Sequence, residues 1–180
     1  EMRTSLLSGL LKTLQYNIKR QQQRIRIFET GLVFNNREDL KQESHIAGLI
    51  TGNINEKEWG KENILTDFYD VKRDVQTFAS SLVHTSDIEL LPSTSKILHP
   101  GQAVDLIVKG ENAGYYGRLH PKICTELNIP INIYIFEIVI NKILKKKKTC
   151  FKKISKYPSV KRDISIIISD EIRFEDVMKC

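Results

Sequence analysis

The sequence predicts an α+β fold, in which a mainly antiparallel sheet is flanked by helices. Two patterns support this class. Apolar residues recur at helical spacing in two long segments, whereas six other segments before residue 141 are short and either alternating or apolar, as is typical of strands. Two of the six segments are joined by a tight glycine-containing turn, which indicates a hairpin and therefore antiparallel pairing.

Before residue 141, three segments are predicted to be helices. The first covers residues 5–20, where one face carries the apolar residues Leu7, Leu10, Leu11, Leu14 and Ile18. The second covers residues 67–82, where one stripe carries Phe68, Val71, Val75, Phe78 and Leu82. A short third helix is predicted from Pro121 to about Leu127, because proline is favoured at the first helical position.

Two of the predicted strands carry apolar residues on both faces. Residues 24–34 and residues 131–140 have this pattern, so we expect both strands to lie inside the sheet and not at its edge. Gly31, within the first of them, predicts either a bulge or a close approach of another group to the backbone.

The other strands before residue 141 are shorter. Residues 45–53 and 88–91 are each predicted to form one strand. Residues 103–109 and a return arm ending near Leu119 are predicted to form the hairpin, with its turn at residues 110–112.

The pattern changes after residue 141. Residues 142–153 are rich in lysine and are predicted to form a basic linker. Alternating Val160, Ile164, Ile166 and Ile168 predict a new strand, and a helix is predicted to start in residues 169–180. We therefore expect three parts, namely a domain over 1–141, a linker over 142–153 and the start of a second domain over 154–180.

The positive charge of the chain is concentrated in one segment. The 180 residues carry a net charge of +6, but residues 142–162 hold ten Lys or Arg residues and no acid, while the rest holds 18 cations and 22 acids. Such a segment suits a polyanion such as RNA. A solvated linker has the same composition, so charge alone leaves both interpretations open.

The cysteines and the apolar runs predict the compartment. Cys124, Cys150 and Cys180 are widely spaced and belong to no CxxC or Cys/His cluster, which predicts reduced thiols and no structural zinc. No apolar run approaches the roughly 20 residues of a membrane span, and residues 1–20 lack a signal-peptide pattern. We expect a cytoplasmic protein with no membrane partner.

No residue pattern predicts catalysis. His99 and His120 each precede a proline at a turn, where histidine usually has a structural role. No serine stands in a GxSxG motif, and the glycines of residues 110–117 lie in a hairpin with no helix N-terminus to bind phosphate. Glu29 stands in an apolar strand, where a buried carboxylate needs a partner; a structural ion pair and a functional role both fit this position.

Several stretches, taken in order, resemble one protein family. They are MRTSLLSGLLKTLQYNIKRQQQRIRIFETGLVF at 2–34, HIAGLITGN at 45–53, DFYDVKRDV at 67–75, LHPGQAVDLIVKGENAGYYGRLHPKICTELNI at 98–129 and ISKYPSVKRDISIII at 154–168. Together they resemble the beta chains of bacterial phenylalanyl-tRNA synthetases, over nearly the whole chain and in the order of the C-terminal part of those proteins.

The resemblance implies a fold and partners. Residues 1–141 would be a catalytic-like but non-catalytic module, a degenerate copy of the class II synthetase core that packs against the catalytic alpha chain. Residues 154–180 would begin a truncated, ferredoxin-like anticodon-binding domain. The complete enzyme of this family is an α2β2 heterotetramer that uses ATP and Mg²⁺ to attach phenylalanine to tRNA(Phe). The magnesium ligands of its beta chain lie in an upstream domain.

The matching strand lacks the arginine of an active class II core. Such a core pairs an acid with an arginine that binds the ATP α-phosphate, and here Glu29 is followed by Thr30, Gly31 and Leu32. No glycine-rich segment ending in arginine follows the hairpin. Without fixed cations on the triphosphate, adenylate formation loses its main electrostatic support. We therefore expect no catalytic, cofactor-binding or metal-binding residue in this segment.

The resemblance also suggests candidate tRNA contacts. Lys156, Lys161 and Arg162 belong to the predicted entry strand of the anticodon-binding domain, which would hold their cations in place. Lys161 and Arg162 would point to opposite faces of that strand, so at most one of the two would face RNA. The alternative function is a free-standing RNA-binding or interaction module that reuses this fold without an alpha chain.

Overall fold

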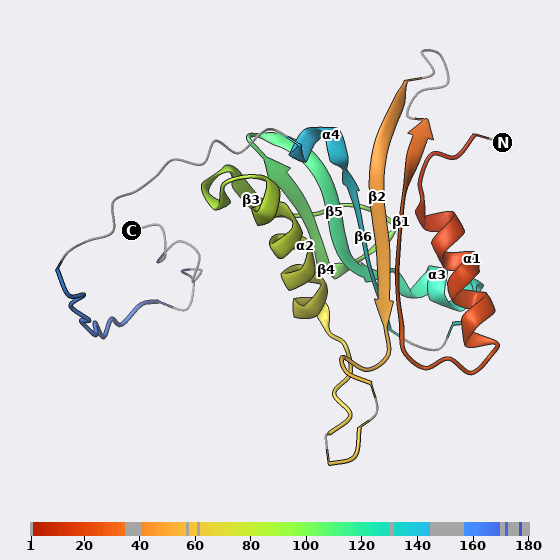
Figure 1. Ribbon diagram of the computed structural model, residues 1–180, viewed down its shortest axis with the longest axis horizontal. Helices are drawn as coiled ribbons and strands as arrows, with labels where there is room; N and C mark the ends of the chain where they lie inside the picture. The colour runs from red at the N-terminus through yellow and green to blue at the C-terminus, as the bar shows by residue number, and fades with distance from the viewer. Residues whose placement is uncertain are drawn as a thin grey trace. The chain divides into compact units, whose positions relative to one another are not determined.

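The computed structural model describes residues 2–34, 41–56, 58–60, 62–129, 132–144 and 157–169, together with Ile172 and Val177. The chain divides into two units, Glu1–Lys148 and Thr149–Cys180. All helices and strands of the described residues that have printed bounds belong to the first unit (Figure 1).

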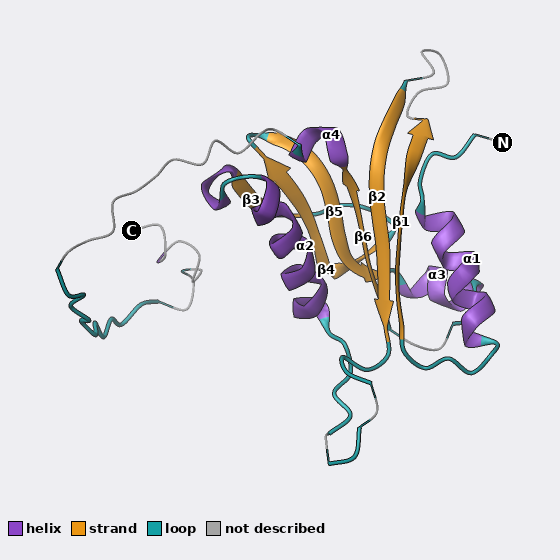
Figure 2. Cartoon of the chain, viewed as in Figure 1, coloured by secondary structure: helices purple, strands orange, loops and turns teal. Residues whose placement is uncertain are grey.

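The first unit is built on one antiparallel sheet, as Figure 2 shows. Within the described residues its six strands follow the order β1-β2-β6-β5-β4-β3, and every neighbouring pair is antiparallel. The strands are β1 (Ile25–Phe34), β2 (Gln42–Thr51), β3 (Ile88–Pro92), β4 (Leu98–Val108), β5 (Glu111–Leu119) and β6 (Ile133–Val139). The predicted α+β class is confirmed.

Helices cover both faces of this sheet. They are α1 (Leu7–Ile18), α2 (Phe68–Leu82), α3 (Pro121–Glu126) and α4 (Ile140–Ile143), and a short 3-10 helix covers Thr85–Asp87. Residues of α1 and α3 share one apolar cluster with one face of the sheet, whereas α2 and α4 share a second cluster with the other face (Figure 1). The sheet is therefore the middle layer of three.

The apolar stripe of α1 forms the first cluster. Leu7, Leu10 and Leu14 are buried and belong to the same cluster as Val33 of β1 and Leu49 of β2. Burying a side chain of this size contributes roughly 1.5–3 kcal/mol, which is enough to hold an amphipathic helix of 12 residues on the sheet.

The start of α2 is fixed by a capping box. The carboxylate of Asp67 accepts the N–H groups of Tyr69 and Asp70, and the carboxylate of Asp70 accepts the N–H of Asp67. These bonds satisfy amides that have no partner inside the helix. The helix then packs its predicted stripe on the sheet, where Val71 and Val75 are buried.

The central position predicted for residues 24–34 is wrong, because β1 is an edge strand. Ile25 and Val33 are buried on the face that α1 covers, but Phe28 and Leu32 on the other face are 71% and 48% exposed. The apolar residues on one face of β1 therefore pack against α1, whereas those on the other face are left uncovered. The second strand with this pattern, β6, is central as predicted, with β2 and β5 as neighbours.

Gly31 is a point of close approach and not a bulge. The pairing of β1 with β2 is continuous from Ile25 opposite Thr51 to Phe34 opposite Gln42. A Cβ added at Gly31 would collide with the guanidinium of Arg3, which lies across the strand at this point. A larger residue here would displace the guanidinium end of the Arg3 side chain.

The predicted hairpin is formed by β4 and β5. Its turn lies at Lys109 and Gly110, which both have positive φ angles, one residue earlier than expected. The register shifts between Leu98 opposite Leu119 and Ala103 opposite Gly117, so β4 holds three more residues than β5 over this stretch. The extra residues push the chain out of the sheet around Pro100.

The strand predicted at residues 160–168 does not form. Residues 157–169 belong to no helix or strand, and all of them are exposed. A strand needs a hydrogen-bonded neighbour, and the described residues of this second unit supply none. The helix predicted over residues 169–180 falls almost wholly outside the described residues.

The basic segment begins inside the first unit. Lys142 and Ile143 lie in α4, where Lys142 Nζ donates to the carbonyl of Asn112 at 2.7 Å and Ile143 is fully buried. Residues 145–156 lie outside the described residues, and with them most of the predicted linker and Lys156.

Candidate functional site

Glu29 has a partner, as a half-buried carboxylate requires. Arg3 Nη1 lies 2.5 Å from Glu29 Oε1, and Arg3 Nε donates to the carbonyl of Leu32 at 2.9 Å. A Cβ on Gly9 of α1 would lie 3.5 Å from Glu29 Oε2, so the carboxylate also lies against the helix. These contacts favour the structural ion pair over a functional role, because the guanidinium is occupied and α1 covers this face of β1.

A second carboxylate is buried more deeply and was missed in the sequence. Glu137 of the central strand β6 is 5% exposed and accepts four hydrogen bonds from distant segments. Its Oε1 accepts from the N–H of Leu6 and lies 3.1 Å from Nδ1 of His45, and its Oε2 accepts from the hydroxyls of Ser5 and Tyr115. We call these five residues the Glu137 cluster.

The Glu137 cluster keeps the phenol of Tyr115 protonated. Burial, followed by the charge of Glu137 and the hydrogen bond to it, raises the pKa of the Tyr115 phenol well above its ordinary value. A carboxylate oxygen accepts hydrogen bonds, so Nδ1 of His45 is the donor in this contact. Its Nε2 is 3.6 Å from Glu43 Oε2, which is beyond hydrogen-bond distance.

The geometry gives the cluster a structural role. A carboxylate has about four lone-pair directions, and the four donors use all of them. Glu137 therefore ties the start of α1 to β2, β5 and β6. The signal in the sequence was a glutamate inside the apolar run IYIFEIV, the same kind of signal that singled out Glu29.

The two His-Pro sites are not turns as the sequence suggested, because His99 and Pro100 lie at the start of β4 and His120 caps the start of α3. Nδ1 of His99 accepts the N–H of Gly101, and Nδ1 of His120 accepts the N–H of Lys122, each at 3.1 Å. Cys124 is half-buried, and burial raises the pKa of its thiol, which disfavours the nucleophilic thiolate.

Two cavities lie at one end of the sheet, and neither is lined by Glu29 or Glu137. The larger, of about 650 Å³, lies between residues 93–98 and the start of α3, and the smaller, of about 220 Å³, lies between residues 118 and 132. Among the described residues, no three His, Cys, Asp or Glu side chains come together as a possible metal site. Nor is any helix there long and apolar enough to cross a bilayer.

The candidate RNA contacts are only partly placed. Lys161 and Arg162 are exposed and belong to no strand, so the expectation that they point to opposite faces loses its basis. Lys156 lies outside the described residues.

Comparison with known proteins decides the family. Residues 1–140 match the model of the phenylalanyl tRNA synthetase beta chain CLM domain. The chain belongs to the family of phenylalanyl-tRNA synthetase beta chains. The match covers the six strands, α1, α2, α3 and the residues of the Glu137 cluster.

Similar full-length beta subunits confirm the assignment. The chain is 36% identical over 179 residues to the phenylalanine–tRNA ligase beta subunit of Methylococcus capsulatus, covering 99% of this chain and 22% of that protein. It is 37% identical to that of Nitrosococcus oceani and 38% identical to that of Photorhabdus laumondii, covering 99% and 98% of this chain and 23% of each relative. The chain thus spans less than a quarter of the length of these relatives.

Proposed function

We propose that this chain is a segment of the beta subunit of a cytoplasmic phenylalanine–tRNA ligase, which attaches phenylalanine to tRNA(Phe) with ATP and Mg²⁺. The observation that carries the proposal is the similarity to phenylalanine–tRNA ligase beta subunits over 99% of the chain. In this role residues 1–141 form the catalytic-like module of the beta chain. Residues 154–180 begin its ferredoxin-like anticodon-binding domain.

The segment itself does not catalyse. Glu29 is the acid that a class II core would pair with an ATP-binding arginine, but the guanidinium beside it, Arg3, is held by Glu29 and by the carbonyl of Leu32. Helix α1 packs on this face of the sheet, with Gly9 beside the carboxylate of Glu29. The residues present do not fit ATP, and ATP and Mg²⁺ serve the complete enzyme.

The uncovered face of β1 supports assembly with the catalytic alpha chain. Phe28 and Leu32 point away from α1 and are largely exposed. Phe136 of β6 lies over Gly48, the residue that pairs with Phe28, which extends the apolar surface across three strands. Exposed apolar surface of this kind is typical of a protein interface. The complete enzyme would be an α2β2 heterotetramer.

The non-catalytic role is tested by ATP–pyrophosphate exchange. The 180-residue chain with phenylalanine, ATP and Mg²⁺ should give exchange at background level, and addition of an alpha chain with the rest of the beta chain should restore it. Clear exchange by the isolated chain, in a preparation free of any alpha chain, would mean that this segment holds a working adenylation site.

A further inference from the structure

The larger of the two cavities is lined by several basic and hydroxyl-bearing side chains. Of the nine lining residues, Lys96 and Lys122 are basic, Ser93, Thr94 and Ser95 carry hydroxyls, and His120 carries an imidazole. The remaining three are apolar, and none is acidic. This composition contrasts with residues outside 142–162, where acids outnumber cations by 22 to 18.

The fold holds the two sides of this cavity in place. On one side, the N–H of Ser93 donates to Ala103 and the N–H of Leu98 donates to the carbonyl of Ser95, which fixes the loop at both ends. On the other side, the N–H of His120 donates to the carbonyl of Ile97 at 2.8 Å. The three extra residues of β4 carry Pro100 outward as a wall, and Leu98, which is 1% exposed, forms an apolar floor.

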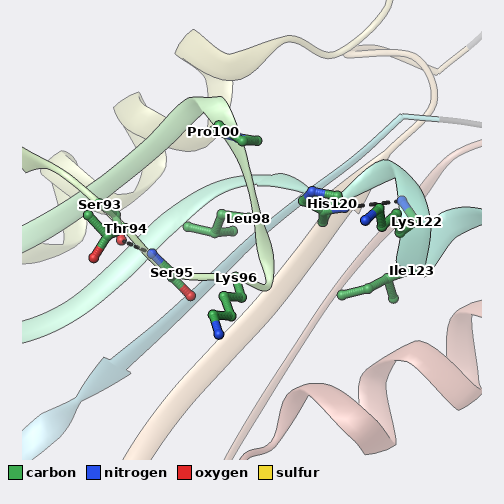
Figure 3. A pocket seen from close by; sticks show the side chains of 9 residues that line it. All are labelled: Ser93, Thr94, Ser95, Lys96, Leu98, Pro100, His120, Lys122 and Ile123. Atoms are coloured by element: carbon green, nitrogen blue, oxygen red, sulfur yellow. Dashed lines mark hydrogen bonds between the residues drawn. The ribbon is translucent and has the colours of Figure 1, made fainter.

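Each polar side chain of the lining can donate a hydrogen bond. In Figure 3 the loop with Ser93, Thr94 and Ser95 lies on one side of Leu98, and His120 and Lys122 lie on the other. Because Nδ1 of His120 accepts the N–H of Lys122, the neutral ring carries its proton on Nε2 and keeps one donor for a ligand. The two ammonium groups and the hydroxyls add further donors.

We propose that this cavity, lined by Lys96, Lys122, His120 and Ser95, binds a phosphate group. A phosphate is an acceptor at every oxygen and is negatively charged, so it matches a lining of donors that has two cations and no acid. The volume of about 650 Å³ also leaves room for the sugar or base attached to a phosphate ester. The phosphate comes from an RNA backbone or from a free phosphate compound.

Chemical-shift titration of the ¹⁵N-labelled 180-residue chain tests this site. One arm uses inorganic phosphate, and the other uses a single-stranded 12-nucleotide oligouridylate at the same low ionic strength. The variant is Lys96→Ala with Lys122→Ala, and the control is Lys12→Ala with Lys72→Ala, which removes the same charge from α1 and α2, outside the cavity. Circular dichroism verifies that both double variants are folded.

We expect saturable shifts at the amides of residues 93–98 and 120–123, with affinity at least about tenfold lower in the Lys96/Lys122 variant and unchanged in the control. Shifts with both probes assign the site to phosphate esters including RNA, and shifts with inorganic phosphate alone assign it to free phosphate. No saturable shift, or equal binding by both double variants, overturns the proposal. The experiment with inorganic phosphate does not depend on the proposed function. Specific phosphate binding would therefore stand even if the ligase assignment were wrong.

Discussion

The carboxylate of Glu137 lies 3.1 Å from Nδ1 of His45, although 92 residues separate them in the chain. The same carboxylate accepts from Ser5, Leu6 and Tyr115, so one buried acid joins the start of α1 to three strands of the sheet. Each donor would lose its partner in a low-dielectric site if the acid were removed.

Removing this acid should destabilise the first unit. We expect Glu137→Ala to lower the free energy of unfolding by roughly 3–5 kcal/mol, because four buried or partly buried donors lose their acceptor. Glu137→Gln should cost less, about 1–3 kcal/mol, since the amide keeps one oxygen acceptor. Urea denaturation at pH 7 measures both. The control is Glu126→Ala at an exposed position of α3, which should change stability by less than about 0.5 kcal/mol; an equal effect of Glu137→Ala would contradict the role of the cluster.

Tyr115 should make stability depend on alkaline pH. Burial and Glu137 raise its pKa above the ordinary value of 10.0, so above pH 10 the folded chain keeps a proton that the unfolded chain releases. Its contribution to stability is therefore complete below about pH 10 and is lost as the pH rises further, by at most about 1.4 kcal/mol per pH unit.

Absorbance of tyrosinate at 295 nm checks this expectation. At pH 11 the folded wild-type chain and Tyr115→Phe should show the same tyrosinate signal, because Tyr115 stays protonated. After unfolding in urea at the same pH, the wild-type chain should show one tyrosinate more than the variant. A larger signal from the folded wild-type chain would show that Tyr115 titrates normally.

The local pattern predicted most elements of the fold but not their neighbours. The stripes of α1 and α2 and the hairpin of β4 and β5 depend on residues close in sequence, so spacing was sufficient to find them. Whether β1 is central or at an edge depends on which strand pairs with it, and its two apolar faces fit both positions. The strand predicted at residues 160–168 fails for the same reason. Alternating apolar residues form a strand only when a neighbouring strand is available to pair with them.

The polar contacts were harder to predict from the sequence than the positions of the strands. Glu29 was recognised as a carboxylate that needs a partner, but Arg3 lies 26 residues away and no spacing rule connects them. Glu137 gives the same signal in β6, and its donors lie up to 132 residues away. The cavity between residues 93–98 and α3 depends on the register shift in β4, and a tertiary irregularity of this kind leaves no periodic pattern.

The basic residues of the second unit should act on tRNA through its phosphates. In the complete enzyme, we expect one of Lys156→Ala, Lys161→Ala and Arg162→Ala to weaken tRNA binding and to lower the log–log salt slope by about one unit. Anticodon base preference should not change, because lysine–phosphate contacts carry no sequence information.

The matched comparison is a quadruple alanine change of Lys145 to Lys148. We expect it to have little effect, because long side chains of a linker lose more entropy on binding than those of an ordered strand in the complete domain. A larger effect of the quadruple change would make the linker the RNA-contacting element. No effect of either set on affinity or salt dependence would mean that the basic segment only connects the two domains.

Assembly with an alpha chain is tested most directly by co-purification. We expect the full-length parent protein, tagged and isolated from its own cells, to retain an alpha-type synthetase chain in a 1:1 ratio. Phe28→Ser with Leu32→Ser should weaken that complex at least about tenfold, because it removes the exposed apolar surface of β1, whereas Trp59→Ser, at a fully exposed loop position, should leave it intact. A parent protein that purifies without any alpha-type chain would contradict the proposed function and favour a free-standing RNA-binding or interaction module.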